Sequence, residues 1–349
     1  MKKITYITLA AAMIMASCSN DSDENTSRPV AAEVTAGVNN PATRANGNAW
    51  EADEIGVMAV SVSGTPAGIT STMTSLYKNV HYTTSSTTAE AAAFTATVPS
   101  SFAAGQTTAY GIFFQDATET VTFAAYAPYQ QSTDANILPG TDGVISQNTA
   151  SQATRDDQKT FDFIFATGAT ASKASQRIQF SDSYAFTHVM TRLIIKVQTS
   201  ANDGFTAADV TSGTYTLTGI THDGTFDVNP ASTTFGKATA STVTSGTATV
   251  PGSSAAGQPW SLTANAISTT ADNTLTFDAI LFPQTAGTLD FEALIDGQSY
   301  KCQISPALEA GKSYTYTITA KKQGLTVEGC KVNDWTAGTT ENNGEADAK

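Results

Sequence analysis

Residues 289–304 read LDFEALIDGQSYKCQI, and this stretch decides the fold class of the chain. Apolar side chains recur at every second position from Leu289 to Ile295, which is the period of a strand with one buried face. A second run of this kind spans residues 300–304. Between the runs stands Asp296-Gly297, which favours a tight turn because glycine tolerates positive φ. The stretch therefore predicts a β-hairpin.

Short alternating runs recur along the whole chain, while helical periodicity is nearly absent. Many short strands separated by turn signals predict an all-β protein built of β-sandwiches. The Thr/Ser/Ala/Gly-rich stretch 239–257 is predicted to be a long loop or a sheet edge. The strand candidates are 55–62, 109–114, 120–126, 161–165, 192–197, 213–220, 275–282, 288–295, 298–304 and 313–321.

Length and charge limit the class of protein. At 349 residues the chain is long enough for two domains, each with its own core. Asn202-Asp203-Gly204 follows an apolar strand, so a boundary near residue 200 divides the chain into comparable halves. The formal net charge of −13 argues against nucleic acid as a partner, because nucleic-acid binding needs a basic patch.

The first residues have the pattern of an export signal. Lys2 and Lys3 precede the apolar run 4–16, which is too short to span a membrane. The run ends in Met-Ala-Ser-Cys18, which resembles the lipobox of bacterial lipoproteins. Residues 1–17 are therefore predicted to be a signal peptide and Cys18 the lipidation site, the alternative being ordinary secretion. The acidic segment 19–25 resembles the export signal that sends Bacteroidetes lipoproteins to the cell surface.

Cys302 and Cys330 remain once Cys18 is assigned. Both lie in predicted strands of an exported chain, where a disulfide can persist. Their spacing does not show whether the Cα atoms approach within about 7 Å. One disulfide and two unpaired core thiols therefore both stay open.

No catalytic or metal-binding motif stands out in the sequence. His81, His188 and His222 are widely spaced, and none belongs to a zinc-type motif. His188 lies beside an apolar strand, which is typical of a structural histidine. Asp162 and Asp182 could form a glycosidase dyad only if the fold brought them together. We predict no enzyme activity, no metal and no cofactor.

Aromatic residues cluster between positions 110 and 129. Such clusters can line carbohydrate-binding or protein-binding surfaces. Neighbouring residues of a strand point to opposite faces, so part of this cluster is expected to be core. Its members are Tyr110, Phe113, Phe114, Phe123, Tyr126 and Tyr129.

Several segments together resemble the fimbrillin-like (Mfa-like) proteins of Bacteroidales, over nearly all of the mature chain. They are ATRA at 42–45, WEADEIGV at 50–57, DFIFA at 162–166, FTHVMTRL at 186–193, LEAGKSYTY at 308–316, GLTVEGC at 324–330 and the closing Asp334-Trp335. The resemblance implies a subunit of type V pili with two tandem transthyretin-like β-sandwich domains of the seven-stranded, Greek-key type. These would span residues 45–199 and 200–335, followed by a polar acidic tail at 336–349.

The resemblance also implies a route of assembly. In the family's stalk subunits an arginine-specific protease removes an N-terminal strand, and the emptied groove accepts a donor strand from a neighbour. Here residues 18–44 would be the lipidated tether and propeptide strand, with the strand at 30–38 and cleavage between Arg44 and Ala45. Arg28 is a second candidate cleavage position. Anchor and accessory subunits can stay uncut, so an unprocessed linker also stays open.

The candidate donor is the last alternating stretch of the chain. Strict alternation puts Leu325, Val327 and Gly329 on one face and Cys330 and Val332 on the other. The same stretch could be an ordinary last strand of the C-terminal domain. The polar tail after Trp335 also departs from a subunit whose very end is the donor.

The leading hypothesis is a structural or accessory pilus subunit, anchored in the outer membrane at the cell surface through Cys18 until it is processed. Its partners would be other pilus subunits through strand exchange, and host or bacterial surface ligands through adhesion. The second hypothesis is a surface adhesin or glycan-binding lipoprotein that never polymerises. The third, a hydrolase, rests only on unplaced carboxylates.

Overall fold

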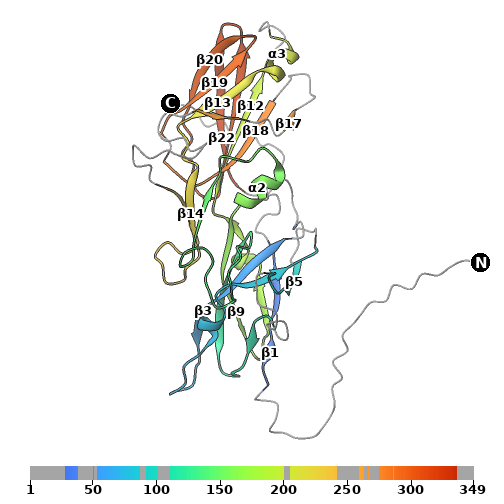
Figure 1. Ribbon diagram of the computed structural model, residues 1–349, viewed down its shortest axis with the longest axis vertical. Coiled ribbons are helices and arrows are strands. Elements are labelled where there is room, and N and C mark those ends of the chain that lie inside the picture. Colours follow the sequence, from blue (N-terminus) through green and yellow to red (C-terminus); the bar gives the residue numbers. More distant parts are fainter. Residues whose placement is uncertain are drawn as a thin grey trace, which may run out of the picture.

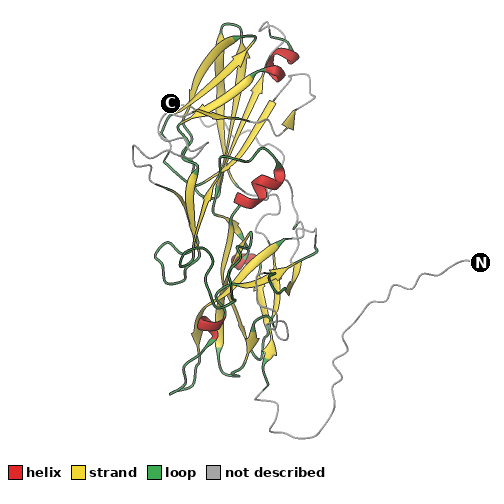
Figure 2. Ribbon diagram, in the orientation of Figure 1, coloured by secondary structure: helices red, strands yellow, loops and turns green. Residues whose placement is uncertain are grey.

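The computed structural model describes residues 28–37, 50, 53–86, 92–100, 110–199, 205–241, 259–262, 266–267, 275–285 and 287–335. These residues form mostly strands, with short helices α1 (Met73–Leu76), α2 (Arg155–Phe161) and α3 (Ala207–Ser212) and a 3-10 turn, η2 (Asp182–Tyr184) (Figure 2). The all-β sandwich prediction is confirmed. Within the described ranges, none of the helices has the length and apolar character needed to cross a membrane.

The N-terminal sandwich surrounds an aromatic-rich core. Its eight-stranded sheet has the order β10-β2-β5-β4-β3-β7-β9-β11 and curls so that β10 contacts β9, while β1 and β6 form a small separate sheet. The strands are β1 (Val30–Ala31), β2 (Glu33–Ala36), β3 (Glu54–Ser63), β4 (Val80–Thr83), β5 (Ala92–Ala96), β6 (Phe113–Phe114), β7 (Thr120–Ala127), β9 (Ile164–Ser172), β10 (Arg177–Phe180) and β11 (Thr187–His188).

The C-terminal sandwich consists of two sheets around a second core. Their orders are β17-β18-β12-β21-β22 and β16-β13-β19-β20. The described part has nine strands, five in one sheet and four in the other. The strands are β12 (Thr191–Gln198), β13 (Thr214–Thr218), β16 (Pro259–Ser261), β17 (Ala266–Ile267), β18 (Leu275–Leu281), β19 (Leu289–Ile295), β20 (Gln298–Ile304), β21 (Lys312–Lys321) and β22 (Gly324–Asp334).

The hairpin predicted at 289–304 is confirmed. β19 and β20 are antiparallel and in register from the pair Leu289 and Ile304 to the pair Ile295 and Gln298. The turn residues Asp296 and Gly297 have φ of 51° and 70°. Positive φ at both turn positions matches the right-handed twist of the strands that the turn joins.

A third sheet joins the two sandwiches, which follow one another along the long axis of the molecule (Figure 1). β8 (Val144–Asn148) pairs with β14 (Asp223–Asp227), and β14 pairs with β15 (Lys237–Ala240). Side chains from both halves meet in a third core at this junction, including Tyr126, Phe163, Phe165, Phe226, Phe282 and Trp335. Packed apolar side chains therefore link the two sandwiches.

The structure corrects the predicted domain boundary near residue 200. β12 pairs with β18 and, in parallel, with β21, so residues 191–198 belong to the C-terminal sandwich. The sheets divide the chain between β11 and β12. The turn signal at 202–204 correctly indicates that a strand ends before it. It does not indicate which sheet that strand belongs to, and the boundary was misplaced for this reason.

The strand predicted at 161–165 is also partly wrong. α2 ends at Phe161, and β9 begins only at Ile164. A capping box starts this helix, because Thr154 Oγ1 accepts from Asp157 N while Asp157 Oδ2 accepts from Thr154 N. Of the strand predicted at 109–114, only β6 is a strand within the described residues.

Candidate functional site

The candidate site is the groove that the N-terminal strand β2 fills. β2 pairs in parallel with β10 and antiparallel with β5, so it has a strand on each side. Val34 and Ala36 point into the core and are 2% and 0% exposed, while Glu33 faces outward. β2 is therefore an internal strand of its sheet.

Backbone hydrogen bonds hold both ends of this segment. Ala32 N donates to Ile112 O at 2.9 Å, and Gly37 N donates to Phe180 O at 2.8 Å. Phe186 N in turn donates to Gly37 O at 3.1 Å. Loss of β2 would leave these groups and the facing edges of β5 and β10 without their partners.

Trp50 lies at one end of the groove and belongs to a segment separate from β2. Its side chain is 1% exposed and makes edge-to-face contacts with Phe94 and Phe186, with ring centroids 5.0 and 5.6 Å apart. Trp50 Nε1 donates to Ala36 O at 3.1 Å. The aromatic contacts hold Trp50 independently of β2.

The predicted processing and lipidation residues lie outside the described residues. Arg44 and Ala45 fall between β2 and Trp50, and Cys18 lies before the first described segment. Their roles remain predictions from the sequence.

The candidate donor, β22, lies at the edge of its sheet. It is the terminal strand of the five-stranded sheet and pairs with β21. Leu325 and Val327 are half-buried against the second core. The pairing with β21 shifts between Thr317 and Ile318, which makes Glu328 a β-bulge residue.

This bulge makes the predicted face of Cys330 wrong. The thiol packs against the same core as Leu325 and Val327, opposite Tyr316 on β21. The extra residue at Glu328 reverses the alternation, so positions beyond it change face.

Cys302 and Cys330 are both free thiols in the structure. They lie on β20 and β22, which are terminal strands of the two facing sheets and contact each other. Burial raises the pKa of Cys302 to about 11 and also raises the pKa of Cys330. Both thiols are half-buried, and the raised pKa values suppress their reactive thiolate form.

The far end of β22 is anchored in the third core. Trp335 is 4% exposed, and its backbone N donates to Gly311 O at 2.6 Å. Its ring stacks on His188, with centroids 4.0 Å apart and planes 9° apart. His188 Nδ1 lies 2.6 Å from Asp162 Oδ1, and these two side chains are 1% and 4% exposed. The end of the C-terminal strand is thus packed on the N-terminal half.

The sequence did not indicate that Asp162, His188 and Trp335 meet. Each belongs to a segment that resembles the fimbrillin-like family, but no local pattern connects positions so far apart. The structural role predicted for His188 agrees with its contacts. Asp182 is exposed in η2 while Asp162 is buried against His188, so the two carboxylates do not share an environment.

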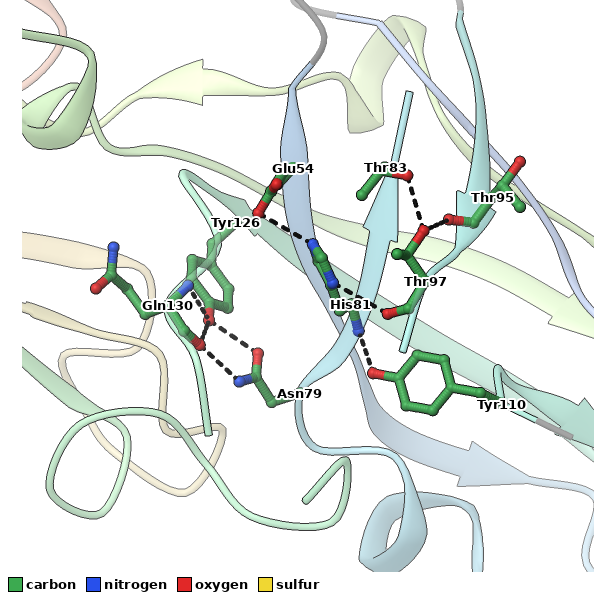
Figure 3. Close-up of polar contacts among 9 residues, drawn as sticks. All are labelled: Glu54, Asn79, His81, Thr83, Thr95, Thr97, Tyr110, Tyr126 and Gln130. Carbon is green, nitrogen blue, oxygen red and sulfur yellow. Dashed lines mark hydrogen bonds and ion pairs between the residues drawn. The ribbon is translucent and has the colours of Figure 1, made fainter. Parts of the chain in front are cut away.

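A polar network crosses strands β4 and β7 in the N-terminal sandwich (Figure 3). Tyr126 Oη donates to Asn79 Oδ1 at 2.8 Å, and Asn79 Nδ2 donates to Gln130 O at 2.9 Å. Burial raises the pKa of Tyr126. These bonds satisfy buried polar groups, which is a structural role.

His81 lies in the same view with both ring nitrogens engaged (Figure 3). Nδ1 is 3.0 Å from Thr97 O, and Nε2 is 3.1 Å from Glu54 Oε2. Tyr110 Oη accepts from the backbone N of His81 at 2.8 Å. Burial lowers the pKa of His81 against the opposing effect of Glu54. A histidine bonded on both nitrogens has no ring nitrogen left to act on a ligand.

Part of the aromatic cluster at 110–129 is core, as expected. Phe114, Phe123 and Tyr126 are 2%, 0% and 0% exposed. The other members are half-buried. Across the described residues, no group of three or more His, Cys, Asp or Glu side chains could hold a metal.

Comparison with known proteins agrees with this architecture. The family model described as fimbrillin-like matches residues 43–335. Fim1C of Bacteroides uniformis, named as a candidate fimbrium subunit, is 29% identical, with 97% of each chain covered. A candidate cell adhesion protein of Bacteroides ovatus has a similar fold, with a TM-score of 0.65, 24% identity and coverage of 90% of this chain and 100% of that one. A second, from Bacteroides uniformis, has a TM-score of 0.58, 26% identity and coverage of 88% and 98%. Because the family model spans most of its length, the chain belongs to the fimbrillin-like family.

Proposed function

We propose that the protein is a structural or accessory subunit of a surface pilus that contributes to adhesion. Its family and the names of the similar proteins support this proposal. The chain would be exported as a lipoprotein and held in the outer membrane through Cys18 until a protease cuts after Arg44. It would then join other pilus subunits by strand exchange. The alternative remains a surface adhesin that does not polymerise.

The internal position of β2 is the observation that carries strand exchange. Cleavage after Arg44 would cut the segment 38–49, which joins β2 to Trp50, so only non-covalent contacts would still hold the strand. Departure of β2 would leave two unpaired strand edges and empty the core positions of Val34 and Ala36. Such a groove favours the addition of an extended segment.

The groove also determines which side chains a donor strand needs in order to fill it. The core-side positions along this segment are Ala32, Val34 and Ala36, and the last two are buried. Ala32 borders a recess of about 410 Å³ with Phe94 and Ile112, so its position accepts a larger side chain. A donor strand that fits this groove has three core-facing residues, one at every second position. In chain order they are large, medium-sized and small.

Residues 325–329, Leu-Thr-Val-Glu-Gly, have this pattern in a regular strand. Val327 would replace Val34, Gly329 would replace Ala36, and Leu325 would fill the Ala32 position. The bulge at Glu328 interrupts the alternation while the segment pairs with β21, and a regular strand between β5 and β10 would restore it. A register that put Val327 in the buried Ala36 position would overpack the core.

The first test is intact mass measurement and N-terminal sequencing of protein recovered from the cell surface. We expect a species that begins at Ala45 and is absent from an Arg44→Ala variant. Arg28→Ala is the matched control, because Arg28 is the other candidate cleavage position. A lipidated species that begins at Cys18 in every protein would favour the anchored, unprocessed alternative.

Polymerisation is tested separately with the cleaved protein. Mixed with its partner subunits, it is expected to form oligomers on size-exclusion chromatography, and a Val327→Asp change in the donor should reduce them. A cleaved protein that stays strictly monomeric with matched partners present would contradict strand exchange.

A further inference from the structure

A polar groove of about 760 Å³ lies at the edge of the N-terminal sandwich. It runs beside β10, the terminal strand of the eight-stranded sheet, and is bordered by β9 and η2. Its lining includes Glu33, Thr170, Arg177, Gln179, Asp182 and Tyr184. This groove lies outside the core positions that β2 fills.

Tyr184 supplies a flat apolar surface in the groove. It is 45% exposed and is the one aromatic among the exposed large apolar residues of the described chain. Gly168 packs against one edge of the Tyr184 ring. A side chain at position 168 would not fit, because its Cβ would lie 2.9 Å from Cδ1 and 2.8 Å from Cε1 of Tyr184. Gly168 has a φ of +97°, which also favours glycine. The backbone thus seats the ring while much of it stays open to solvent.

Hydrogen-bonding groups stand beside this ring in a connected arrangement. Gln179 Nε2 donates to Ser181 Oγ at 2.8 Å, and Ser181 Oγ donates to Asp182 Oδ2 at 3.1 Å. Arg177 Nη2 lies 3.4 Å from Glu33 Oε2. Amide, carboxylate and guanidinium groups together offer many donors and acceptors along one groove. Such a site suits a ligand with one apolar face and several hydroxyl groups.

We infer that this groove binds a neutral saccharide. The C–H groups of a pyranose form an apolar face that lies on the Tyr184 ring, while its hydroxyls bond to Gln179, Asp182 and Arg177. The charged lining residues are two acids, Glu33 and Asp182, and one base, Arg177, which leaves one negative charge. That balance disfavours an acidic sugar. The inference rests on the proposed function only in giving its adhesive part a ligand class.

Glu33 connects this groove to the N-terminal strand. It lies on β2, opposite Arg177 on β10. Strand exchange in the register proposed above would put Thr326 in its place and leave Arg177 without this partner. The uncleaved chain, in which Glu33 is present, is therefore the form to test.

The experiment applies purified uncleaved protein to an array of oligosaccharides from host-type and bacterial glycans. Some end in neutral hexoses or N-acetylhexosamines and others in sialic or glucuronic acid. We expect binding to the neutral set, weakened about tenfold by Tyr184→Ala and retained in Tyr184→Phe. Leu294→Ala is the matched control, because Leu294 is also 45% exposed but lies on β19 of the other sandwich.

Three results would overturn the inference. They are no binding to any neutral saccharide, a preference for the acidic set, and neutral binding that Tyr184→Ala leaves unchanged. Thermal unfolding checks each variant, and Gln179→Ala gives an independent reading if Tyr184→Ala misfolds. Because the array uses uncleaved protein, a negative array does not count against strand exchange. An uncut Arg44 likewise does not count against this site.

Discussion

Strands β2 and β22 occupy opposite kinds of position in the molecule. β2 lies between β5 and β10, with its core residues Val34 and Ala36 2% and 0% exposed. β22 is a terminal strand that presents the half-buried Leu325 and Val327. An enclosed strand leaves only when its sandwich opens, whereas an edge strand can detach locally. The contrast suits a groove that holds its occupant and a donor that must leave its own sheet.

Although β22 lies at the edge of its sheet, a contact at its end opposes its detachment. Trp335, at its end, is buried in the third core and stacked on His188. Full release of the strand would draw this ring out of the junction between the sandwiches. It would also expose the buried contact between His188 and Asp162. Detachment of β22 and loosening of the junction are therefore linked events.

The largest expected effect comes from placing a charge on each strand. Val34→Asp puts an unpaired carboxylate into a closed core and should cost about 4 kcal/mol or more of unfolding free energy. Val327→Asp, on the half-buried edge, should cost about 1 kcal/mol. Urea unfolding of the two uncleaved variants measures the difference. Equal losses would show that β2 and β22 are held equally firmly.

The next effect tests the anchor at the end of β22. Trp335→Ala removes a buried indole from the third core and should cost about 3–4 kcal/mol. Hydrogen exchange of the β22 amides should become faster, because the strand loses its fixed end. Val332→Ala is the control, because Val332 lies on the same strand but is 47% exposed. Unchanged exchange in Trp335→Ala would mean that pairing with β21 alone holds the strand.

Local sequence was sufficient for some of these features. The hairpin at 289–304 follows from alternation and from the conformational preference of Gly297, and both act within a few residues. A strand within residues 30–38 was also predicted from alternation, and β2 lies in that range. In these cases each residue's own neighbours fix its environment.

The features that could not be predicted from the sequence depend on pairing between strands that are far apart in the chain. The bulge at Glu328 exists only in relation to β21, so no local pattern indicates that Cys330 changes face. β12 joins the C-terminal sandwich through β18 and β21, far along the chain. The contacts of Trp335 with His188, and of Tyr184 with Gly168, likewise depend on which strands become neighbours.

The smallest expected effect is the response of the junction to acid. His222 is buried immediately before β14 begins, with Nδ1 3.2 Å from Thr149 Oγ1. Burial lowers its pKa from 6.5 to about 4. The unfolded chain therefore binds a proton near pH 6.5 that the folded chain does not bind until about pH 4. Stability should fall by about 3 kcal/mol as the pH drops through this window.

Urea unfolding at pH 7, 5.5 and 4 measures this loss, and His222→Gln should flatten the curve. The lowered pKa of His81 acts in the same direction, so part of the slope should remain in that variant. Because His222 lies at the junction and β2 lies far inside the N-terminal sandwich, acid should speed hydrogen exchange in β8 and β14 before it does so in β2. If acid instead speeds hydrogen exchange first in β2, the groove is the least stable part of the molecule. The enclosed strand β2 would then not be held more firmly than the edge strand β22.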